Sequence, residues 1–143
     1  MTESEFLKKF EVQLADTLRV REGSVLAVSN GTTALTLALM CESVSYDDEV
    51  IIPGYCFAAP ANTVCALGAK PIIVDVLPDT WCIDPKAVKK AITDKTKAIV
   101  AVHNYGNLCA MDELLEIAND HGIAVVEDAA ESFLSIYKDT TSG

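Results

Sequence analysis

Basic side chains are scarce in this sequence. Its 143 residues include 11 Lys and Arg against 21 Asp and Glu, which gives a formal net charge of −10. A chain this acidic is not expected to bind nucleic acid or an anionic membrane surface, because both require phosphates to be neutralised. The length is sufficient for one buried hydrophobic core.

Histidines are few and the cysteines are unpaired, which argues against a metal site and a disulfide scaffold. The chain has two histidines and five cysteines, without a C-x-x-C pair. We therefore expect no metal and no set of disulfides. Cys41 and Cys65 fall in apolar stretches with a helical pattern, where we expect buried free thiols.

Long hydrophobic runs are absent as well. No window approaches the roughly 18 consecutive apolar residues of a membrane-spanning helix. Residues 1–10 lack the basic start and apolar stretch of a secretory signal. No repeat or linker is visible along the chain. These observations favour a single domain in the cytoplasm.

The sequence does contain a regular alternation of short apolar segments and helical patterns. Thr2 and Glu5 have the spacing of a capping box, and the helix they begin is expected to end near Leu18. Asp84 and Pro85 have the pattern of another helix start. Five strands are expected, with a helix in each connection: residues 25–29, 49–52, 71–76, 97–102 and 123–127.

These expected strands are nearly continuous apolar runs, so both of their faces should be covered. Such strands are typical of a parallel sheet with right-handed helical crossovers. We predict an α/β fold of three layers, with a mostly parallel sheet and flanking helices. Ligands of such sheets lie beyond the carboxyl ends of the strands, and the segments leaving those ends are the candidates for a site.

Gly31, Thr32 and Thr33 follow the first expected strand and begin a helix. The unpaired N–H groups of a helix start can bind a phosphate without any lysine. The same residues also fit an ordinary strand-to-helix turn with a threonine cap. No G-x-G-x-x-G or Walker pattern follows any strand, which argues against a generic nucleotide-binding domain.

Aromatic and acidic side chains follow the other strands. Tyr55 and Phe57 could each stack on a planar ring or belong to the core. His103, taken alone, fits a structural role better than a catalytic one. Asp128 ends the last strand, where a buried carboxylate needs either a cationic partner or a helix to cap. Glu131 could complete a capping box and have no other function.

Seven stretches at these strand ends and helix starts resemble one known family. They are VSNGTTAL (28–35), DEVIIPGYCFAAPAN (48–62), LGAKPIIVDV (67–76), TWCIDP (80–85), KTKAIVAVHNYGN (95–107), MDEL (111–114) and VVEDAAES (125–132). In order and spacing they resemble the DegT/DnrJ/EryC1/StrS sugar aminotransferases. These are pyridoxal 5'-phosphate (PLP) enzymes with the aspartate-aminotransferase fold, fold type I. The resemblance covers roughly residues 6–143.

The resemblance implies a role for each candidate. The backbone of residues 31–33 would hold the PLP phosphate, and Phe57, in preference to Tyr55, would stack on the cofactor ring. Asp128 would pair with the pyridinium nitrogen, and Glu131 takes the place of a His, Gln or Glu near the cofactor's phenolic oxygen. The family also implies a nucleotide-sugar substrate, glutamate as amino donor, and a homodimer with the PLP site at the subunit boundary.

The family's Schiff-base lysine lies downstream of these stretches, and no lysine of this chain matches it. We therefore expect residues 1–143 to be a truncated large-domain fragment of the PLP-transferase fold, with the C-terminal small domain absent. It would contain no catalytic residue and would not transaminate alone. The alternative is a non-catalytic interaction or dimerisation module that keeps the fold without the cofactor. Leu134 and Asp139 stand where the family usually has glycine.

Overall fold

The computed structural model describes residues 2–142, which divide into two units that meet between Asn30 and Gly31 in the sequence. The first unit contains helix α1 (Glu3–Leu18). The Thr2 side chain accepts a hydrogen bond from the Glu5 N–H, and the Glu5 carboxylate accepts one from the Thr2 N–H. This is the predicted capping box, and it sets the start of the helix.

Residues 25–29 are not a strand, and this prediction was wrong. A strand needs a neighbour that pairs with its backbone groups. Here the N–H of Ala27 donates instead to the carboxylate of Glu11, at 2.9 Å. A short apolar run by itself does not show whether such a neighbour exists.

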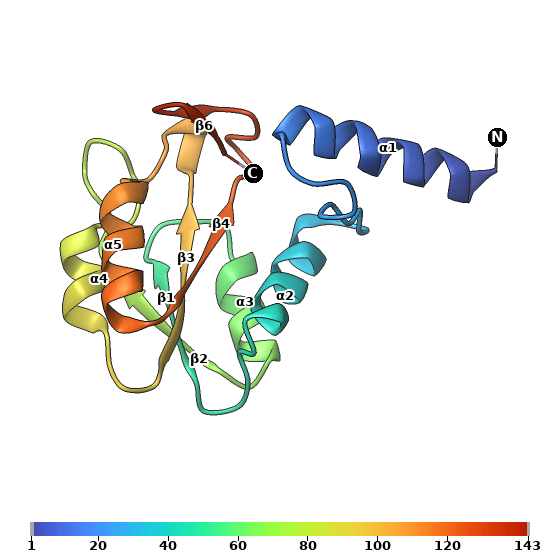
Figure 1. The fold of residues 1–143 in the computed structure, drawn as a ribbon. Coiled ribbons are helices and arrows are strands. Elements are labelled where there is room, and N and C mark those ends of the chain that lie inside the picture. Colours follow the sequence, from blue (N-terminus) through green and yellow to red (C-terminus); the bar gives the residue numbers. More distant parts are fainter. Residues whose placement is uncertain (1, 143) are drawn as a thin grey trace. The chain divides into compact units, whose positions relative to one another are not determined.

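The second unit contains a sheet of four parallel strands in the order β2-β1-β3-β4. Its strands are β1 (Glu49–Pro53), β2 (Lys70–Val74), β3 (Thr96–Val102) and β4 (Ala124–Asp128). The helices are α2 (Gly31–Cys41), α3 (Ala59–Ala66), α4 (Pro85–Ala91) and α5 (Met111–His121), with the 3-10 turn η1 (Asn104–Gly106). Helices α4 and α5 cover one face of the sheet and α2 and α3 cover the other (Figure 1). The predicted three-layer α/β fold is confirmed.

The two faces of the sheet belong to two hydrophobic clusters. Ile51 and Ile99 pack in the cluster that includes α4 and α5. Val50, Ile52 and Val100 pack in the cluster that includes α2 and α3. All five side chains are completely buried or nearly so. Because successive strand residues point to opposite faces and both faces are covered, the strands are continuous apolar runs.

The start of α4 follows from local chemistry. The Asp84 carboxylate accepts a hydrogen bond from the Lys86 N–H at 2.9 Å, and Pro85 occupies the first turn. Ile83 and Val88, which flank this cap, are both fully buried. The helix start predicted at this position is therefore present and is tied to the core.

The expected burial of two cysteines was wrong. Cys41 and Cys65 are exposed, whereas Cys82 and Cys109 are buried. Helix α2 is rich in apolar residues, but only Leu35 and Leu39 are buried. Apolar residues on its outer face, Cys41 among them, are left in contact with solvent, and composition alone does not tell the two faces apart.

A short antiparallel hairpin, not anticipated from the sequence, follows the sheet. It consists of β5 (Ile136–Tyr137) and β6 (Thr140–Thr141). The Lys138 side chain at its tip pairs with Asp112 of α5. Before the hairpin, Leu134 has a φ of 63°, and its N–H donates to the Ser142 carbonyl at 3.2 Å. Leu134 therefore occupies a conformation that favours glycine.

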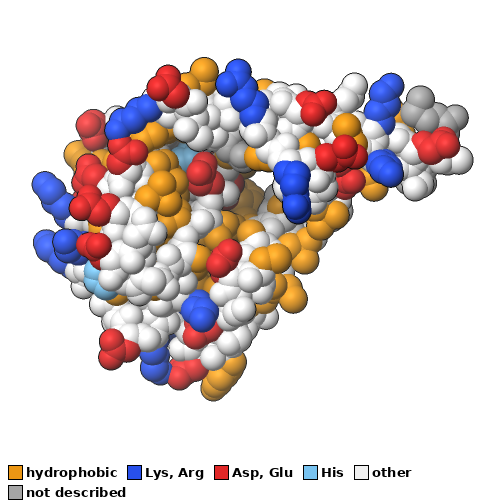
Figure 2. Space-filling view, in the orientation of Figure 1, with side chains coloured by type: hydrophobic (Ala, Val, Ile, Leu, Met, Phe, Trp, Pro, Cys, Tyr) orange, Lys and Arg blue, Asp and Glu red, His pale blue; other side chains and the backbone are white. Residues whose placement is uncertain are grey.

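None of the helices within residues 2–142 combines the length and the apolar character needed to cross a bilayer. On the face drawn in Figure 2, hydrophobic side chains nevertheless reach the surface at several places among charged ones.

Replacing Leu134 by glycine should stabilise the protein. A left-handed conformation costs an L-residue roughly 1–2 kcal/mol, and glycine offsets part of this gain through roughly 1 kcal/mol of additional unfolded-chain entropy. We expect Leu134→Gly to raise the free energy of unfolding by up to about 1 kcal/mol in urea titrations. Phe133→Gly, at a neighbouring exposed position without a positive φ, should lower it. An equal decrease in the free energy of unfolding of both variants would show that the backbone at Leu134 is not strained.

Candidate functional site

The loops that leave the carboxyl ends of β1 and β3 are joined by one buried amide. The Asn104 Nδ2 donates to the backbone carbonyl of Tyr55 at 2.9 Å and to that of Trp81 at 2.7 Å. The Asn104 side chain thus holds together three segments that are far apart in the chain. Asn104 itself is 5% exposed, and both of its N–H donors are satisfied.

We call the edge of the sheet at the carboxyl ends of the strands the rim. Tyr105, on this rim, connects the loop after β1 with the loop after β4. Its N–H donates to the Glu131 Oε2 at 2.6 Å, and its hydroxyl is 2.6 Å from the hydroxyl of Tyr55. Tyr105 has a φ of 55°, which is costly for a residue other than glycine. The hydrogen bond to Glu131 holds the backbone in this conformation.

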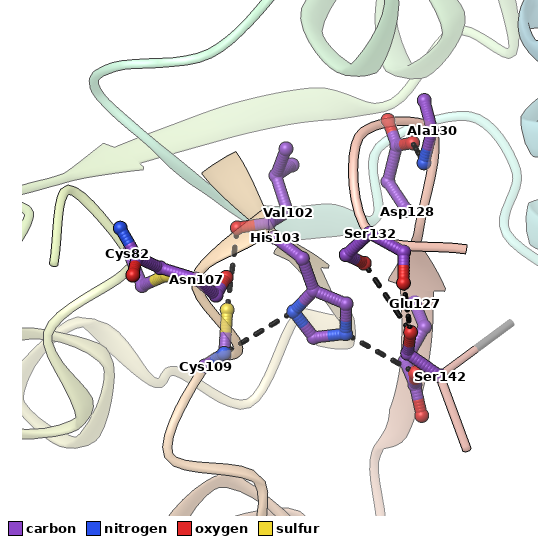
Figure 3. Close-up of polar contacts among 10 residues, drawn as sticks. All are labelled: Cys82, Val102, His103, Asn107, Cys109, Glu127, Asp128, Ala130, Ser132 and Ser142. Atoms are coloured by element: carbon purple, nitrogen blue, oxygen red, sulfur yellow. Dashed lines mark hydrogen bonds and ion pairs between the residues drawn. The ribbon is translucent and has the colours of Figure 1, made fainter. Parts of the chain in front are cut away.

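His103 is completely surrounded by protein and its ring is fully engaged. Nδ1 accepts from the Cys109 N–H at 3.2 Å, so Nε2 carries the proton that is directed at the Glu127 carboxylate, also at 3.2 Å (Figure 3). Its backbone N–H donates to the Asp128 carbonyl. These contacts agree with a structural role for His103, which joins the ends of β3 and β4.

Asp128 is half-buried at the end of β4. Its Oδ1 accepts from the Ala130 N–H at 3.2 Å (Figure 3). Burial raises the pKa of the Cys56 thiol, and the negative charge of Asp128 raises it further. Among residues 2–142, Asp128 forms no ion pair.

A cavity of about 390 Å³ lies beside the end of β4, within the roughly 300–1,000 Å³ that is usual for small-molecule sites. Gly31, at the start of α2, and Asp128 both contribute to its wall. The complete lining is Gly31, Ala34, Leu35, Ala38, Val126, Glu127, Asp128, Ala129, Ala130 and Phe133. Two candidates that are 97 positions apart in the sequence therefore border one space.

Gly31 has no conformational or packing reason to be glycine. Its φ is outside the left-handed region, and a Cβ added to it would meet nothing within 4 Å. The contrast is Gly54, whose added Cβ would lie 3.1 Å from the Val74 carbonyl oxygen. Glycine at position 31 leaves open space at a helix N-terminus, as a ligand that approaches the backbone requires.

The other candidates lie on the same rim but outside this cavity wall. Thr32 is exposed, Thr33 is half-buried, and neither lines the cavity. Phe57 is 80% exposed on the loop after β1 and does not line it either. Glu131 is exposed, with its carboxylate bound to the Tyr105 N–H. The structure thus brings Gly31 and Asp128 to the wall of one cavity, whereas Thr32, Thr33, Phe57 and Glu131 lie outside that wall.

Sequence reasoning missed Asn104 and Trp81. Asn104 interacts with residues 49 and 23 positions away, and Trp81 stacks on Tyr55, with ring centroids 5.0 Å apart. Their importance depends on partners that only the fold brings near. In the part of the chain that the structure describes, no group of three or more His, Cys, Asp or Glu side chains could hold a metal ion.

Comparison with known proteins gives a consistent result. The DegT/DnrJ/EryC1/StrS aminotransferase family matches residues 1–143. The GDP-perosamine synthase of Caulobacter vibrioides is 43% identical over 138 residues, which are 96% of this chain and 37% of that protein.

Solved structures agree. DesV of S. venezuelae, in complex with a ketimine intermediate, superposes with a TM-score of 0.89 at 37% identity, over 96% of this chain and 36% of that one. The E. coli GDP-4-keto-6-deoxy-D-mannose-3-dehydratase with bound hydrated PLP gives a TM-score of 0.90 at 29% identity, over 99% and 38%. The chain thus spans little more than a third of the length of these relatives.

The effect of Asp128 on Cys56 can be measured. A negative charge disfavours the thiolate, so Asp128→Asn should lower the pKa of Cys56 and shift its alkylation profile to lower pH. The asparagine Oδ1 can still accept from the Ala130 N–H. The measurement is the rate of iodoacetamide modification at Cys56 against pH, by mass spectrometry, with the exposed Cys41 and Cys65 replaced by serine.

Asp120→Asn is the matched control, because it makes the same charge change at the far end of α5. It should leave the Cys56 profile in place. Identical profiles for the Asp128 and Asp120 variants would show that the carboxylate of Asp128 does not face the loop after β1.

Proposed function

Because the chain belongs to the DegT/DnrJ/EryC1/StrS aminotransferase family, we propose that residues 1–143 are the cofactor-holding part of a PLP-dependent nucleotide-sugar aminotransferase. The observation that carries the proposal is the shared cavity of Gly31 and Asp128. Gly31 begins a helix whose N-terminus can bind a phosphate, and Asp128 has a carboxylate that can pair with a protonated ring nitrogen. The names of the relatives, such as the GDP-perosamine synthase, support a nucleotide sugar as substrate.

The proposed phosphate site is the first turn of α2. Gly31, Thr32 and Thr33 supply backbone N–H groups there, and the helix dipole adds a partial positive charge. A phosphate site made of backbone suits a chain with a net charge of −10. The open space beside Gly31 supports this assignment, since no atom of the described residues lies within 4 Å of a Cβ added there.

Asp128 is proposed to hold a proton at the pyridine nitrogen. It is half-buried and has no ion pair among residues 2–142, so a cationic ligand would compensate its charge. When bound, PLP supplies an electron-withdrawing ring for amino-group transfer. Phe57, exposed on the adjacent loop, would stack on that ring, and Glu131 would face its phenolic oxygen.

Transamination is proposed to require groups beyond residues 1–143. Moving protons between carbons needs a positioned base, which in this family is the lysine that carries the cofactor. No lysine lines the cavity in the part of the chain described here. These residues alone would bind the cofactor without covalent attachment and would not turn over glutamate or a keto-sugar.

A homodimer in the cytoplasm is part of the same proposal. Exposed apolar side chains on the segment after β4, at Phe133, Leu134 and Ile136, support self-association. They equally support the second candidate, a non-catalytic interaction module that retains the fold without PLP. Cofactor binding distinguishes the two.

Pyridoxamine 5'-phosphate is the sharpest probe, because it has no aldehyde and cannot react with surface lysines. We expect the protein to bind it in equilibrium dialysis, and Asp128→Asn to weaken binding by about tenfold or more, as for loss of a charged hydrogen bond worth about 1.5–3 kcal/mol. Phe57→Ala should also weaken it. Asp120→Asn is the charge-matched control and should bind like the parent.

No binding of pyridoxamine 5'-phosphate to a folded parent protein would reject the proposal in favour of the interaction module. Equal affinity of the Asp128 and Asp120 variants would reject the assigned role of Asp128.

Gly31→Ala separates ligand binding from folding. A methyl group at this position would have no other atom of residues 2–142 within 4 Å, and alanine favours helix, so the free energy of unfolding should stay the same or rise by up to about 1 kcal/mol. The methyl group would nevertheless occupy the space beside the phosphate site. Affinity for pyridoxamine 5'-phosphate and for inorganic phosphate should therefore fall. Unchanged affinity would place the phosphate elsewhere.

A further inference from the structure

Three aromatic rings form an exposed cluster on the rim, outside the cavity of Gly31 and Asp128. The rings of Tyr55 and Trp81 have centroids 5.0 Å apart and are tilted by 48°. Those of Tyr55 and Tyr105 are 6.3 Å apart and tilted by 42°. The three residues are 42%, 45% and 65% exposed, in the order Tyr55, Trp81 and Tyr105. We call Tyr55, Trp81 and Tyr105 the aromatic platform.

The aromatic platform is held in place by hydrogen bonds with two polar side chains, Asn104 and Glu131, and between its own hydroxyls. The buried amide of Asn104 binds the backbone of both Tyr55 and Trp81. Glu131 binds the N–H of Tyr105, and the hydroxyls of the two tyrosines are paired. Each ring is thereby fixed through its own backbone or its own hydroxyl.

The aromatic platform lowers the stability of the free protein in two ways, and a bound ligand would offset both. The left-handed backbone of Tyr105, with a φ of 55°, is strained for a residue other than glycine. Aromatic rings contribute most to stability when they are buried, and these three leave much of their surface in water. Backbone strain and rigidly held exposed aromatic rings are both typical of binding sites.

On the proposed function, on which this inference rests, we infer that the aromatic platform binds the sugar ring of the nucleotide-sugar substrate. The C–H bonds of a pyranose face carry a small positive charge and pack on the negative faces of aromatic rings. The paired phenol hydroxyls can exchange hydrogen bonds with sugar hydroxyls. Glu131 makes this part of the rim acidic, which disfavours the diphosphate there.

The protonation of the platform is compatible with an uncharged ligand. The hydrogen bond to Tyr55 raises the pKa of Tyr105 above its ordinary value, and the negative charge of Glu131 acts in the same direction. The phenol of Tyr105 is therefore protonated near neutral pH and is available as a donor.

Trp81 is the only tryptophan of the chain, so its fluorescence reports directly on the platform. The probes are GDP-mannose, GDP and methyl α-mannopyranoside, each titrated against the 143-residue protein. We expect saturable fluorescence changes with GDP-mannose and, at higher concentration, with the methyl glycoside, but none with GDP.

Tyr105→Asn should raise the apparent Kd for GDP-mannose by about tenfold, consistent with stacking worth about 1–3 kcal/mol. Asparagine tolerates the left-handed backbone, so this variant removes the ring without adding strain. The control is Tyr46→Asn, because Tyr46 is 85% exposed and precedes β1 at the other end of the strand. Tyr105→Phe keeps the ring and should lose less affinity than Tyr105→Asn.

A fluorescence change with GDP as large as that with GDP-mannose would assign the platform to the nucleotide and overturn the inference. So would equal affinities of the Tyr105 and Tyr46 variants, or no response to GDP-mannose. The proposed function has a separate readout in pyridoxamine 5'-phosphate binding. Cofactor binding without a platform response therefore rejects the platform alone, and the reverse result rejects the proposed function.

Discussion

The parallel pairing of β1, β3 and β4 is the constraint on which the candidate site depends. In a parallel sheet every strand ends at the same edge, so the segments after residues 53, 102 and 128 emerge side by side. The pairing is supported from both faces, since Ile51 and Ile99 pack towards α4 and α5 while Val50 and Val100 pack towards α2 and α3.

The electrostatics of the rim follow from what the chain lacks. With a net charge of −10 it cannot rely on a basic patch to attract an anion. Helix α2 begins at Gly31 beside the cavity, and a helix start offers N–H groups and a partial positive charge without a lysine. The half-buried Asp128, which lines the same cavity, then suits a ligand with an anionic and a cationic end. A phosphorylated pyridine is such a ligand.

Strain is concentrated where the loops must turn sharply. Tyr105 and Leu134 both have a positive φ. The N–H of Tyr105 donates to a side chain, the Glu131 carboxylate, whereas the N–H of Leu134 donates to a backbone carbonyl, that of Ser142. Glu131 therefore links the proposed cofactor site to the aromatic platform through one hydrogen bond. A substitution of Glu131, in the loop after β4, would remove the hydrogen bond to the Tyr105 N–H, although the two residues are 26 positions apart in the chain.

The sequence by itself determined the layered fold, the capped helix starts at Thr2 and Asp84, and the chemical types expected at the strand ends. These depend on local spacing and on apolar runs, which act over a few residues. Residues 25–29 show the limit, because an apolar run becomes a strand only if a neighbour pairs with it. Only the tertiary structure decided that Gly31 and Asp128 share a cavity, that Asn104 joins two loops, and that Cys41 faces solvent. Each of these depends on which distant segments meet, and local physical chemistry does not specify that.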